Sequence, residues 1–302
     1  MKPVLTLALA AFTALIAAQA HADSPSDYLG PRELALGESS RASSIGASAT
    51  TMNPAGLALT RELVGEAFYG YRSGASDSHL ASVAACDSTV PVAGCLYYRY
   101  FRDTPAEGAS DRRRAHELGS TVARGFGGRI FVGVTSRYFD YSSRSGNPDD
   151  KGFGVDGGLL LRVIDAVSLG VVGYNLVSAS STQYRRSVGA GITVRPFRAF
   201  SLSADGLWRI EGDDDEGSKS RYGGGAEYFI SGANGQTGYP LRAGVMRDVT
   251  ADVTYVSGGL GVATELIGLD VGARKELDGD GLAILVSLRL FGPRFAPGQR
   301  RP

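Results

Sequence analysis

Cysteine, histidine, methionine and tryptophan are all scarce in this chain of 302 residues. It contains two cysteines, three histidines, three methionines and one tryptophan. A catalytic triad or a four-ligand zinc site needs His or Cys residues with suitable partners, and no histidine here lies in a recognisable motif of that kind. The scarcity argues against an enzyme and against a metalloprotein, and it gives no reason to expect a cofactor.

An excess of charge of one sign is also absent. The chain holds 31 Lys and Arg residues against 31 Asp and Glu residues, so its formal net charge is zero. Nucleic-acid binding proteins usually carry a basic surplus, so we predict no nucleic-acid partner. After Ala22 no apolar run reaches the ~20 residues that a membrane helix requires, which excludes a helical membrane protein.

The first 22 residues have the layout of a secretory signal peptide. Lys2 supplies a positive start, residues 4–18 are apolar, and Ala20-His21-Ala22 offers small residues where signal peptidase cleaves. A membrane anchor is the competing interpretation, but the apolar stretch is shorter than a span needs. We therefore predict that residues 1–22 are a signal peptide and that the mature chain is exported.

The two cysteines are nine positions apart, at Cys86 and Cys95. Between them, residues 87–91 (Asp-Ser-Thr-Val-Pro) are typical of a turn. An exported chain meets an oxidising compartment, where such a pair forms a disulfide more often than a metal site. The sequence therefore predicts a structural disulfide that staples one β-hairpin.

Glycine and tyrosine, by contrast, are abundant, with 42 and 14 residues. From Leu63 onward, apolar residues recur at every second position, which is the period of a β-strand. In the last stretch, even-numbered positions 282–290 all hold Leu, Ile or Val, whereas Ser287 and Arg289 occupy odd positions. Each predicted strand thus has one apolar face and one face with charge or glycine.

Fourteen such strands can be counted, an even number as in bacterial single-chain barrels. Tight turns alternate with longer polar connections, which places both chain ends on the periplasmic side of a barrel. The predicted strands are 62–72, 78–86, 93–103, 113–126, 129–142, 152–163, 166–177, 185–195, 199–211, 220–230, 239–247, 252–264, 267–277 and 281–291.

Both a soluble β-sandwich and a membrane barrel would show this alternation. The segments run to about ten residues, the length of a tilted strand that crosses a bilayer, whereas soluble strands usually stop at about five or six. Aromatic residues also gather near the segment ends, as in the girdles of outer-membrane barrels. We therefore predict an all-β transmembrane antiparallel barrel in the cell outer membrane, in contact with its lipid. The girdle residues are Tyr69, Tyr71, Tyr98, Tyr100, Tyr138 and Trp208.

The polar faces place charges of both signs inside this barrel. Buried charges must find partners, so we interpret them chiefly as a lattice of ion pairs that fills the lumen, with a polar channel wall as the alternative. The inward charges are Arg137, Asp156, Arg162, Arg195, Asp205, Arg209, Glu227, Asp270, Arg274, Glu276 and Arg289. The acidic runs at 211–216 and 278–281 lack a regular calcium-ligand spacing and are interpreted as a solvated loop and a hairpin turn.

Residues 23–60 do not alternate. They are small, polar and rich in Gly, Ala and Ser, with too few large apolar residues for an amphipathic helix with its own core. We predict that this segment is a plug within the barrel. The predicted organisation is thus a signal peptide at 1–22, a plug at 23–60, a barrel at 61–291 and a periplasmic tail at 292–302.

The plug carries a recognisable string. Arg41-Ala42 is followed by small residues around Gly46, and Asn53-Pro54-Ala55-Gly56-Leu57-Ala58 stands just before the first strand. This arrangement resembles the N-terminal signature of the FadL-like outer-membrane transport proteins and is similar to the related barrel subunit of type IX secretion. The resemblance implies a fourteen-stranded barrel with an N-terminal hatch, in which Asn53, Pro54 and Ala55 help to close the lumen.

Two departures from that family leave two functions open. The connections between strands are short, polar and poor in Leu, Ile and Phe, and the tail continues past Phe291 with Pro293 and Pro297. A FadL-like barrel passively transports hydrophobic small molecules. Short loops and a basic tail suit instead a non-transporting scaffold, with periplasmic or outer-membrane protein partners, in a secretion or gliding-motility machinery.

Overall fold

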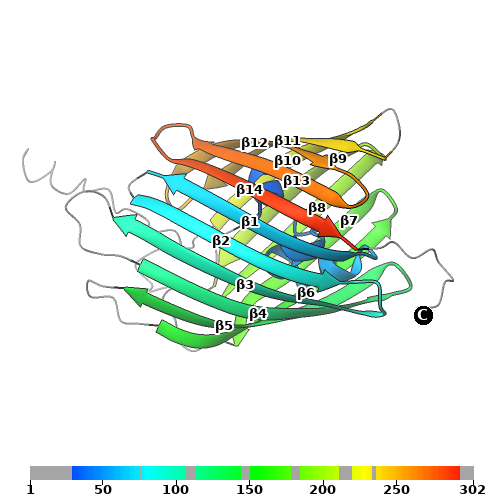
Figure 1. The fold of residues 1–302 in the computed structure, drawn as a ribbon, viewed down its shortest axis with the longest axis horizontal. Coiled ribbons are helices and arrows are strands. Elements are labelled where there is room, and N and C mark those ends of the chain that lie inside the picture. Colours follow the sequence, from blue (N-terminus) through cyan, green and yellow to red (C-terminus); the bar gives the residue numbers. More distant parts are fainter. Residues whose placement is uncertain are drawn as a thin grey trace, which may run out of the picture.

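A computed structural model describes residues 29–74, 76–105, 113–143, 150–177, 184–210, 220–232 and 236–292. Within these residues, fourteen antiparallel strands form a closed barrel in which each strand pairs with its neighbours along the chain (Figure 1). The barrel closes where the first strand pairs with the last, with Val64 opposite Phe291 and Tyr71 opposite Ile284. The predicted fold class is confirmed.

The strands begin and end within two residues of the predicted boundaries. They are β1 (Leu63–Ser73), β2 (Ser76–Asp87), β3 (Val92–Pro105), β4 (Arg113–Phe126), β5 (Ile130–Ser143), β6 (Asp150–Ile164), β7 (Val167–Val177), β8 (Ser187–Phe197), β9 (Phe200–Arg209), β10 (Ser220–Ser231), β11 (Gly238–Asp248), β12 (Val253–Ala263), β13 (Ile267–Glu276) and β14 (Leu282–Phe291).

The two faces of the wall differ as the period of two predicts. In β14, Leu282, Ile284, Val286, Leu288 and Leu290 are exposed on the outside, whereas Ala283, Leu285 and Ser287 are buried on the inside. The same alternation continues around the barrel, so the outer surface is predominantly apolar and the inner surface is predominantly polar.

Connections at the two ends of the barrel divide its strands into hairpins. We call the end at which β1 begins and β14 ends the turn end, and the opposite end the loop end. At the turn end, β4 and β5 are joined through Gly127 and Gly128, whose φ angles of 58° and 67° lie in the left-handed region that favours glycine. Residues 278–281 join β13 to β14 at the loop end in a bend, as predicted for that acidic run.

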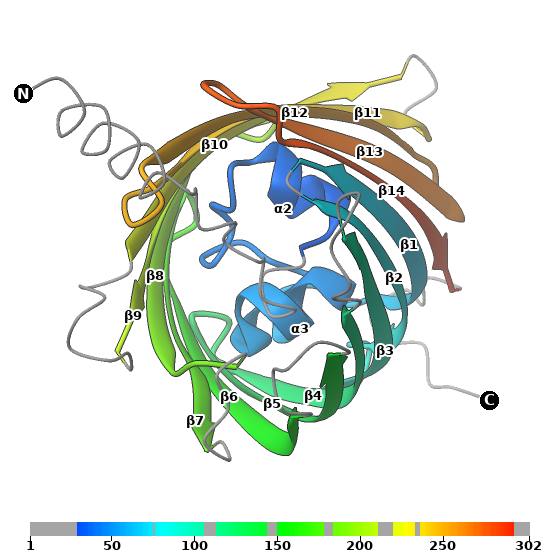
Figure 2. The ribbon, with the colours of Figure 1, turned by 90° about the vertical axis from the view of Figure 1, so that its left-hand side faces the viewer.

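The residues before β1 lie inside the barrel, where Figure 2 shows α2 and α3 encircled by the wall. We call residues 29–62 the inner segment. It contains α2 (Pro31–Ala35), η2 (Gly46–Ser48), α3 (Ala49–Met52) and η3 (Pro54–Ala58), each no longer than five residues. Such short helices are not stable alone, so packing against the wall must hold them.

No helix among the described residues is both long and apolar enough to cross a membrane. The predicted signal peptide at 1–22, the acidic loop at 211–216 and all but the first residue of the predicted tail at 292–302 lie outside the described residues.

A disulfide joins Cys86 to Cys95, which confirms the predicted pair. The two cysteines lie directly opposite each other in the β2–β3 hairpin, near the turn end. Both side chains point inward and are buried in one apolar cluster with Ala49 and Leu57 of the inner segment. The disulfide therefore staples the hairpin and also forms part of the floor on which the inner segment packs.

We expect the C86S/C95S double variant to lose about 2–3 kcal/mol of unfolding free energy, because the closed loop restricts the unfolded chain. Urea unfolding of the detergent-solubilised barrel measures this loss. Reductant should lower the stability of the unmodified chain to the same value and leave the variant unchanged. Equal stability of the two oxidised proteins would show that the disulfide contributes nothing.

Candidate transport site

Asn53 connects the inner segment to the barrel wall. Its amide Nδ2 donates to the carbonyl oxygen of Arg41 at 2.9 Å and to that of Leu159 in β6 at 3.2 Å. Its Oδ1 accepts from the Ala55 backbone N–H at 3.1 Å and so caps η3, which begins at Pro54. Ala55 packs on Phe131 and Leu160 of the wall. The predicted hatch residues therefore fix the chain against β5 and β6.

Glycines on the inner face of the wall leave room for the backbone of the inner segment. At nine inward positions a Cβ atom would come closer than 3 Å to atoms of the inner segment, a distance that real Cβ atoms do not tolerate. We call these residues the glycine band. They are Gly133, Gly158, Gly170, Gly189, Gly223, Gly225, Gly244, Gly259 and Gly272, on eight of the strands from β5 to β13. The abundance of inward glycine is thus explained by close approach of two backbones.

Arg41 anchors the middle of the inner segment. Its backbone N–H and its Nη1 donate to Oδ2 of Asp205 at 2.8 and 3.2 Å, and its Nε lies 3.1 Å from the Tyr174 hydroxyl. That hydroxyl donates to the Met52 carbonyl at 2.6 Å. Burial alone would lower the pKa of Arg41, but Tyr174 and nearby carboxylates reverse this and raise it, so the guanidinium stays charged.

A second network joins the start of the inner segment to strands β10 to β14. Arg32 donates to both carboxylate oxygens of Glu227 at 3.1 and 3.2 Å, and Glu227 also accepts from Arg242 at 2.6 Å. Arg242 reaches Asp270 at 2.5 Å, and Arg289 also pairs with Asp270. The alternation of sign along this chain keeps each buried charge compensated.

Farther along the segment, Arg274 of β13 pairs with Glu38 at 2.6 Å. Glu38 follows Gly37, and both have positive φ angles, of 64° and 62°. Gly37 also lies so close to Val245 that a Cβ there would collide with the wall backbone. The tight turn at these two residues therefore places the carboxylate beside Arg274.

A third network lies within the wall. Arg137 makes two hydrogen bonds to Asp156, at 2.6 and 2.7 Å, and a third to Oδ1 of Asn175 at 2.6 Å. Asp156 also accepts from the Asn175 backbone N–H at 2.8 Å. Asn175 has a φ of 54° and lies where the β6–β7 register shifts, so the carboxylate satisfies a donor that this bulge frees from the ladder.

The remaining predicted lumen charges lie near the rims. Arg162 donates to the carbonyl oxygen of Gly128 in the β4–β5 turn at 3.3 Å. Arg195 is half-buried near the end of β8, Arg209 is the last residue of β9, and Glu276 is the last residue of β13.

Sequence reasoning missed the charges that face this set from the inner segment, Arg32, Glu38 and Arg41, and also the pair Arg99–Glu117. Arg99 donates to Glu117 at 2.8 Å and to the hydroxyls of Thr50 and Thr51 at 2.5 and 2.6 Å. Both wall residues stand at inward positions of their strands, so the period of two was a usable signal for them.

One part of the inner wall is apolar. Leu80, Phe101, Ala115 and Tyr141 lie opposite one another in register on β2, β3, β4 and β5, and all four are buried in one cluster with Phe68 packed against it. We call these four residues the apolar row. Along the inner wall, the apolar row lies between two ion pairs. The Arg99–Glu117 pair is next to it on the turn-end side, and the Asp103–Arg113 pair is next to it on the loop-end side.

Two further aromatic residues extend the apolar character of this region. Phe139 is on the same face of β5 as Tyr141, and its ring stacks on that of Tyr184 with the centroids 4.0 Å apart. Both rings are buried. Charge and glycine define the inward face predicted from the sequence, so this apolar part of the inner wall was not among the predicted features.

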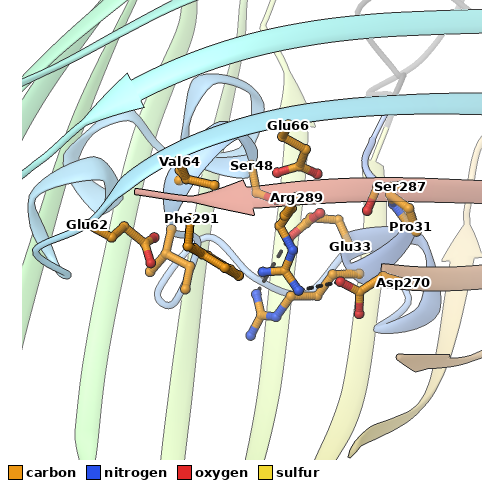
Figure 3. A pocket seen from close by; sticks show the side chains of 13 residues that line it. Pro31, Glu33, Ser48, Glu62, Val64, Glu66, Asp270, Ser287, Arg289 and Phe291 are labelled. Atoms are coloured by element: carbon orange, nitrogen blue, oxygen red, sulfur yellow. Dashed lines mark hydrogen bonds and ion pairs between the residues drawn. The ribbon is translucent and has the colours of Figure 1, made fainter. Parts of the chain in front are cut away.

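A small polar cavity of about 20 Å³ lies between the inner segment and strands β1, β13 and β14 (Figure 3). Glu33, Glu66 and Arg289 point into it, and Oε2 of Glu33 is buried without a hydrogen-bond partner among the described residues. A cavity of this size has room for about one water molecule. It is too small and too polar to hold a hydrophobic compound.

The described residues contain no group of three or more His, Cys, Asp and Glu side chains arranged to hold a metal ion. The inside of the barrel thus offers ion pairs, a fitted inner segment and one apolar row. This arrangement can exclude water and ions while it provides a contact surface for apolar molecules.

No protein-family model matches the chain, and no curated protein matches it at the sequence level. Several solved structures do match it in fold. The Ralstonia pickettii toluene transporter TbuX is 13% identical, with a TM-score of 0.71 over 88% of this chain and 99% of that one. The monoaromatic hydrocarbon channel CymD is 14% identical, with a TM-score of 0.67 over 89% and 98%.

A Pseudomonas aeruginosa FadL homologue is 10% identical, with a TM-score of 0.65 over 87% of this chain and 98% of that one. At sequence identities this low, the structural similarity supports a shared fold only, and it extends over nearly the whole of each barrel. The chain therefore has the FadL-type barrel fold that the resemblance in its N-terminal segment predicts.

Proposed function

We propose that this chain is a passive transporter of small hydrophobic molecules, with aromatic hydrocarbons as the first class of substrate. The observation that carries the proposal is the apolar row, which provides buried Leu80, Phe101 and Tyr141 at a level of the inner wall on the loop-end side of Arg99 and Glu117. Its aromatic rings suit flat aromatic compounds. Two structures of the same fold are described as a toluene transporter and a monoaromatic hydrocarbon channel, which supports this choice.

The proposed location is the outer membrane. Large apolar side chains such as Leu96, Leu118 and Leu260 are more than half exposed on the outside of the barrel, at 66%, 61% and 57%. An outer surface of this kind is stable in contact with lipid and would drive a water-soluble protein to associate. The predicted signal peptide supports export to that membrane.

The inner segment is the proposed hatch, with Asn53, Pro54 and Ala55 at its contact with β5 and β6. It lies across the lumen (Figure 2) and is held by the glycine band and by Arg32, Glu38 and Arg41. Substrate that reaches the apolar row from the loop end therefore meets this segment next. Passage to the turn end then requires a rearrangement of the hatch.

The close fit of the hatch also favours a second candidate function. A barrel whose lumen stays shut would serve as a scaffold for protein partners in a secretion or motility machinery. The nine glycine contacts and the ion pairs are as compatible with a permanent seal as with a hatch that opens. Uptake measurements distinguish the two functions, because a scaffold passes no substrate.

We expect the chain to increase entry of radiolabelled toluene into cells whose outer membrane limits uptake, and F101D to reduce that increase by roughly tenfold. A buried carboxylate without a partner makes the apolar row unfavourable for hydrocarbons, and a tenfold loss corresponds to ~1.4 kcal/mol. The initial rate of uptake at equal amounts of folded barrel is the measurement.

The matched control is F101L, which keeps the row apolar and should retain most of the uptake. Heat-dependent mobility in electrophoresis checks that each variant forms the barrel. Uptake that does not depend on the chain at all would refute transport and support the scaffold. Uptake that F101D leaves unchanged would show that the apolar row is not on the path.

A further inference from the structure

The outer face of the barrel carries an apolar groove of about 460 Å³. Its floor is formed by the small residues Ala67 and Ala81 on β1 and β2, and the rings of Tyr69 and Tyr98 rise beside it. β13, β14, β1, β2 and β3 run side by side over this face (Figure 1). The other outward side chains that line the groove are Val83, Leu269, Val286 and Leu288.

Each of the two tyrosines that border the groove binds a histidine. The hydroxyl of Tyr69 lies 2.6 Å from Nδ1 of His79, and that of Tyr98 lies 2.7 Å from Nδ1 of His116. Within the described residues these are the only histidines. The two pairs repeat the same geometry on adjacent hairpins, β1–β2 and β3–β4, on the loop-end side of the groove.

Two arginines lie beside these histidines on the same outer face. Arg102 is directly opposite His79 on one side and Arg114 on the other, so the three residues form a row across β2, β3 and β4. Neighbouring strands are about 4.8 Å apart, and like charges directly opposite each other are destabilising. Both arginines are exposed and form no ion pair with any described residue.

The described acidic residues on this face do not balance the charge of the two arginines. Asp77 is exposed on β2, two positions from His79. Asp140 on β5 is opposite His116, but it is already paired with Lys151 at 3.0 Å. Among the residues of this face that the structure describes, one carboxylate therefore remains against two guanidinium groups, and a bound anion would relieve the repulsion between Arg102 and Arg114.

We propose that this surface is a binding site for a phosphorylated, acylated lipid of the outer leaflet. One acyl chain would occupy the groove, and the phosphate would bind Arg102 and Arg114 with His79 and His116 as further donors. The tyrosines join the two parts, because their rings border the apolar groove while their hydroxyls hold the histidines of the polar row. The site goes beyond transport through the lumen and rests only on the proposed membrane location.

The test titrates the purified full chain, in detergent micelles, with diphosphorylated lipid A and measures bound lipid by native mass spectrometry. We expect the R102Q/R114Q variant to bind at least roughly tenfold more weakly, because it loses the charged hydrogen bonds to the phosphate. The matched control is R124Q/K275Q, which removes two exposed charges from other parts of the outer face and should bind as the unmodified chain does. Equal affinity of the two variants would overturn the proposal.

A second arm separates a lipid site from a simple anion site. The A67F variant fills the floor of the groove and should weaken binding of lipid A, whereas the deacylated phosphorylated disaccharide should bind poorly to every form. Tight binding of that disaccharide, unaffected by A67F, would show an anion site without an acyl subsite and would refute the proposal. Protein dimers that the lipid does not displace, and that A67F abolishes, would show instead that a second copy occupies the groove.

Discussion

Replacing Gly158 by valine is expected to open the barrel to small polar solutes. A side chain at this inward position of β6 would collide with Asn53 and Pro54, which hold the inner segment against β5 and β6. Overpacking of this kind costs about 1–3 kcal/mol, which shifts the equilibrium between seated and displaced segment by roughly 5–150-fold. Single-channel conductance in planar bilayers should therefore rise from a closed baseline to frequent openings.

The matched control for this variant is G94V. Gly94 is also in a strand, but nothing lies within 4 Å of the Cβ that would be added there, because it faces outward. The two variants therefore share the change in strand composition and differ only in contact with the inner segment. If G158V folds into a barrel and conducts no more than G94V, the segment does not seal the lumen through its contact at Asn53.

The strands could be predicted because their signal is local. The position of a residue such as Leu288 or Ser287 in the alternation indicates whether its side chain points outward or inward. Fourteen segments with this pattern predict the fourteen strands of the barrel wall. The disulfide could be predicted for a similar reason, since Cys86 and Cys95 flank a short turn and an antiparallel hairpin places them opposite each other. Neither inference needs knowledge of what fills the lumen.

The interior could be predicted only in part, because it depends on which residues meet across the barrel. Gly158 and Gly94 look alike in the sequence, yet a Cβ atom added at Gly158 would collide with Asn53, whereas one added at Gly94 would have no atom within 4 Å. The alternation predicts an inward Asp205, but its partner Arg41 is 164 positions away in a segment without strand periodicity. The alternation predicts the face of a residue, whereas the partner depends on the path of the inner segment.

The apolar row also could not be predicted from the alternation alone. Phe101 and Tyr141 stand at inward positions, but their strands also carry large apolar or aromatic residues outward, such as Tyr98 and Tyr138. On strands with aromatics on both faces, the contrast that marks a lumen-facing position is weak. Only the registers of β2 to β5 show that four inward apolar residues lie side by side.

The second large effect is expected at Asp156. The D156A variant would leave the Arg137 guanidinium buried, with only the hydrogen bond to the Asn175 side chain among those described, and would also remove the acceptor for the Asn175 backbone N–H. Breaking a buried ion pair from one side costs about 3–5 kcal/mol, since the remaining charge has lost its partner. Urea unfolding in lipid vesicles should show a loss of this size.

The double variant R137M/D156L separates charge from hydrogen bonding. It removes both charges, so most of the loss should be recovered, and a residual cost of about 1–3 kcal/mol should remain for the unsatisfied N–H in the β6–β7 bulge. The exposed pair Asp140–Lys151 is the matched comparison, where D140A should cost less than about 1 kcal/mol. Similar losses for D156A and D140A would mean that water reaches Arg137 and that the lumen at this level is hydrated. The expected large difference would instead mean that the Arg137–Asp156 pair lies in a dry layer of the barrel, between the hatch contact at Asn53 and the apolar row.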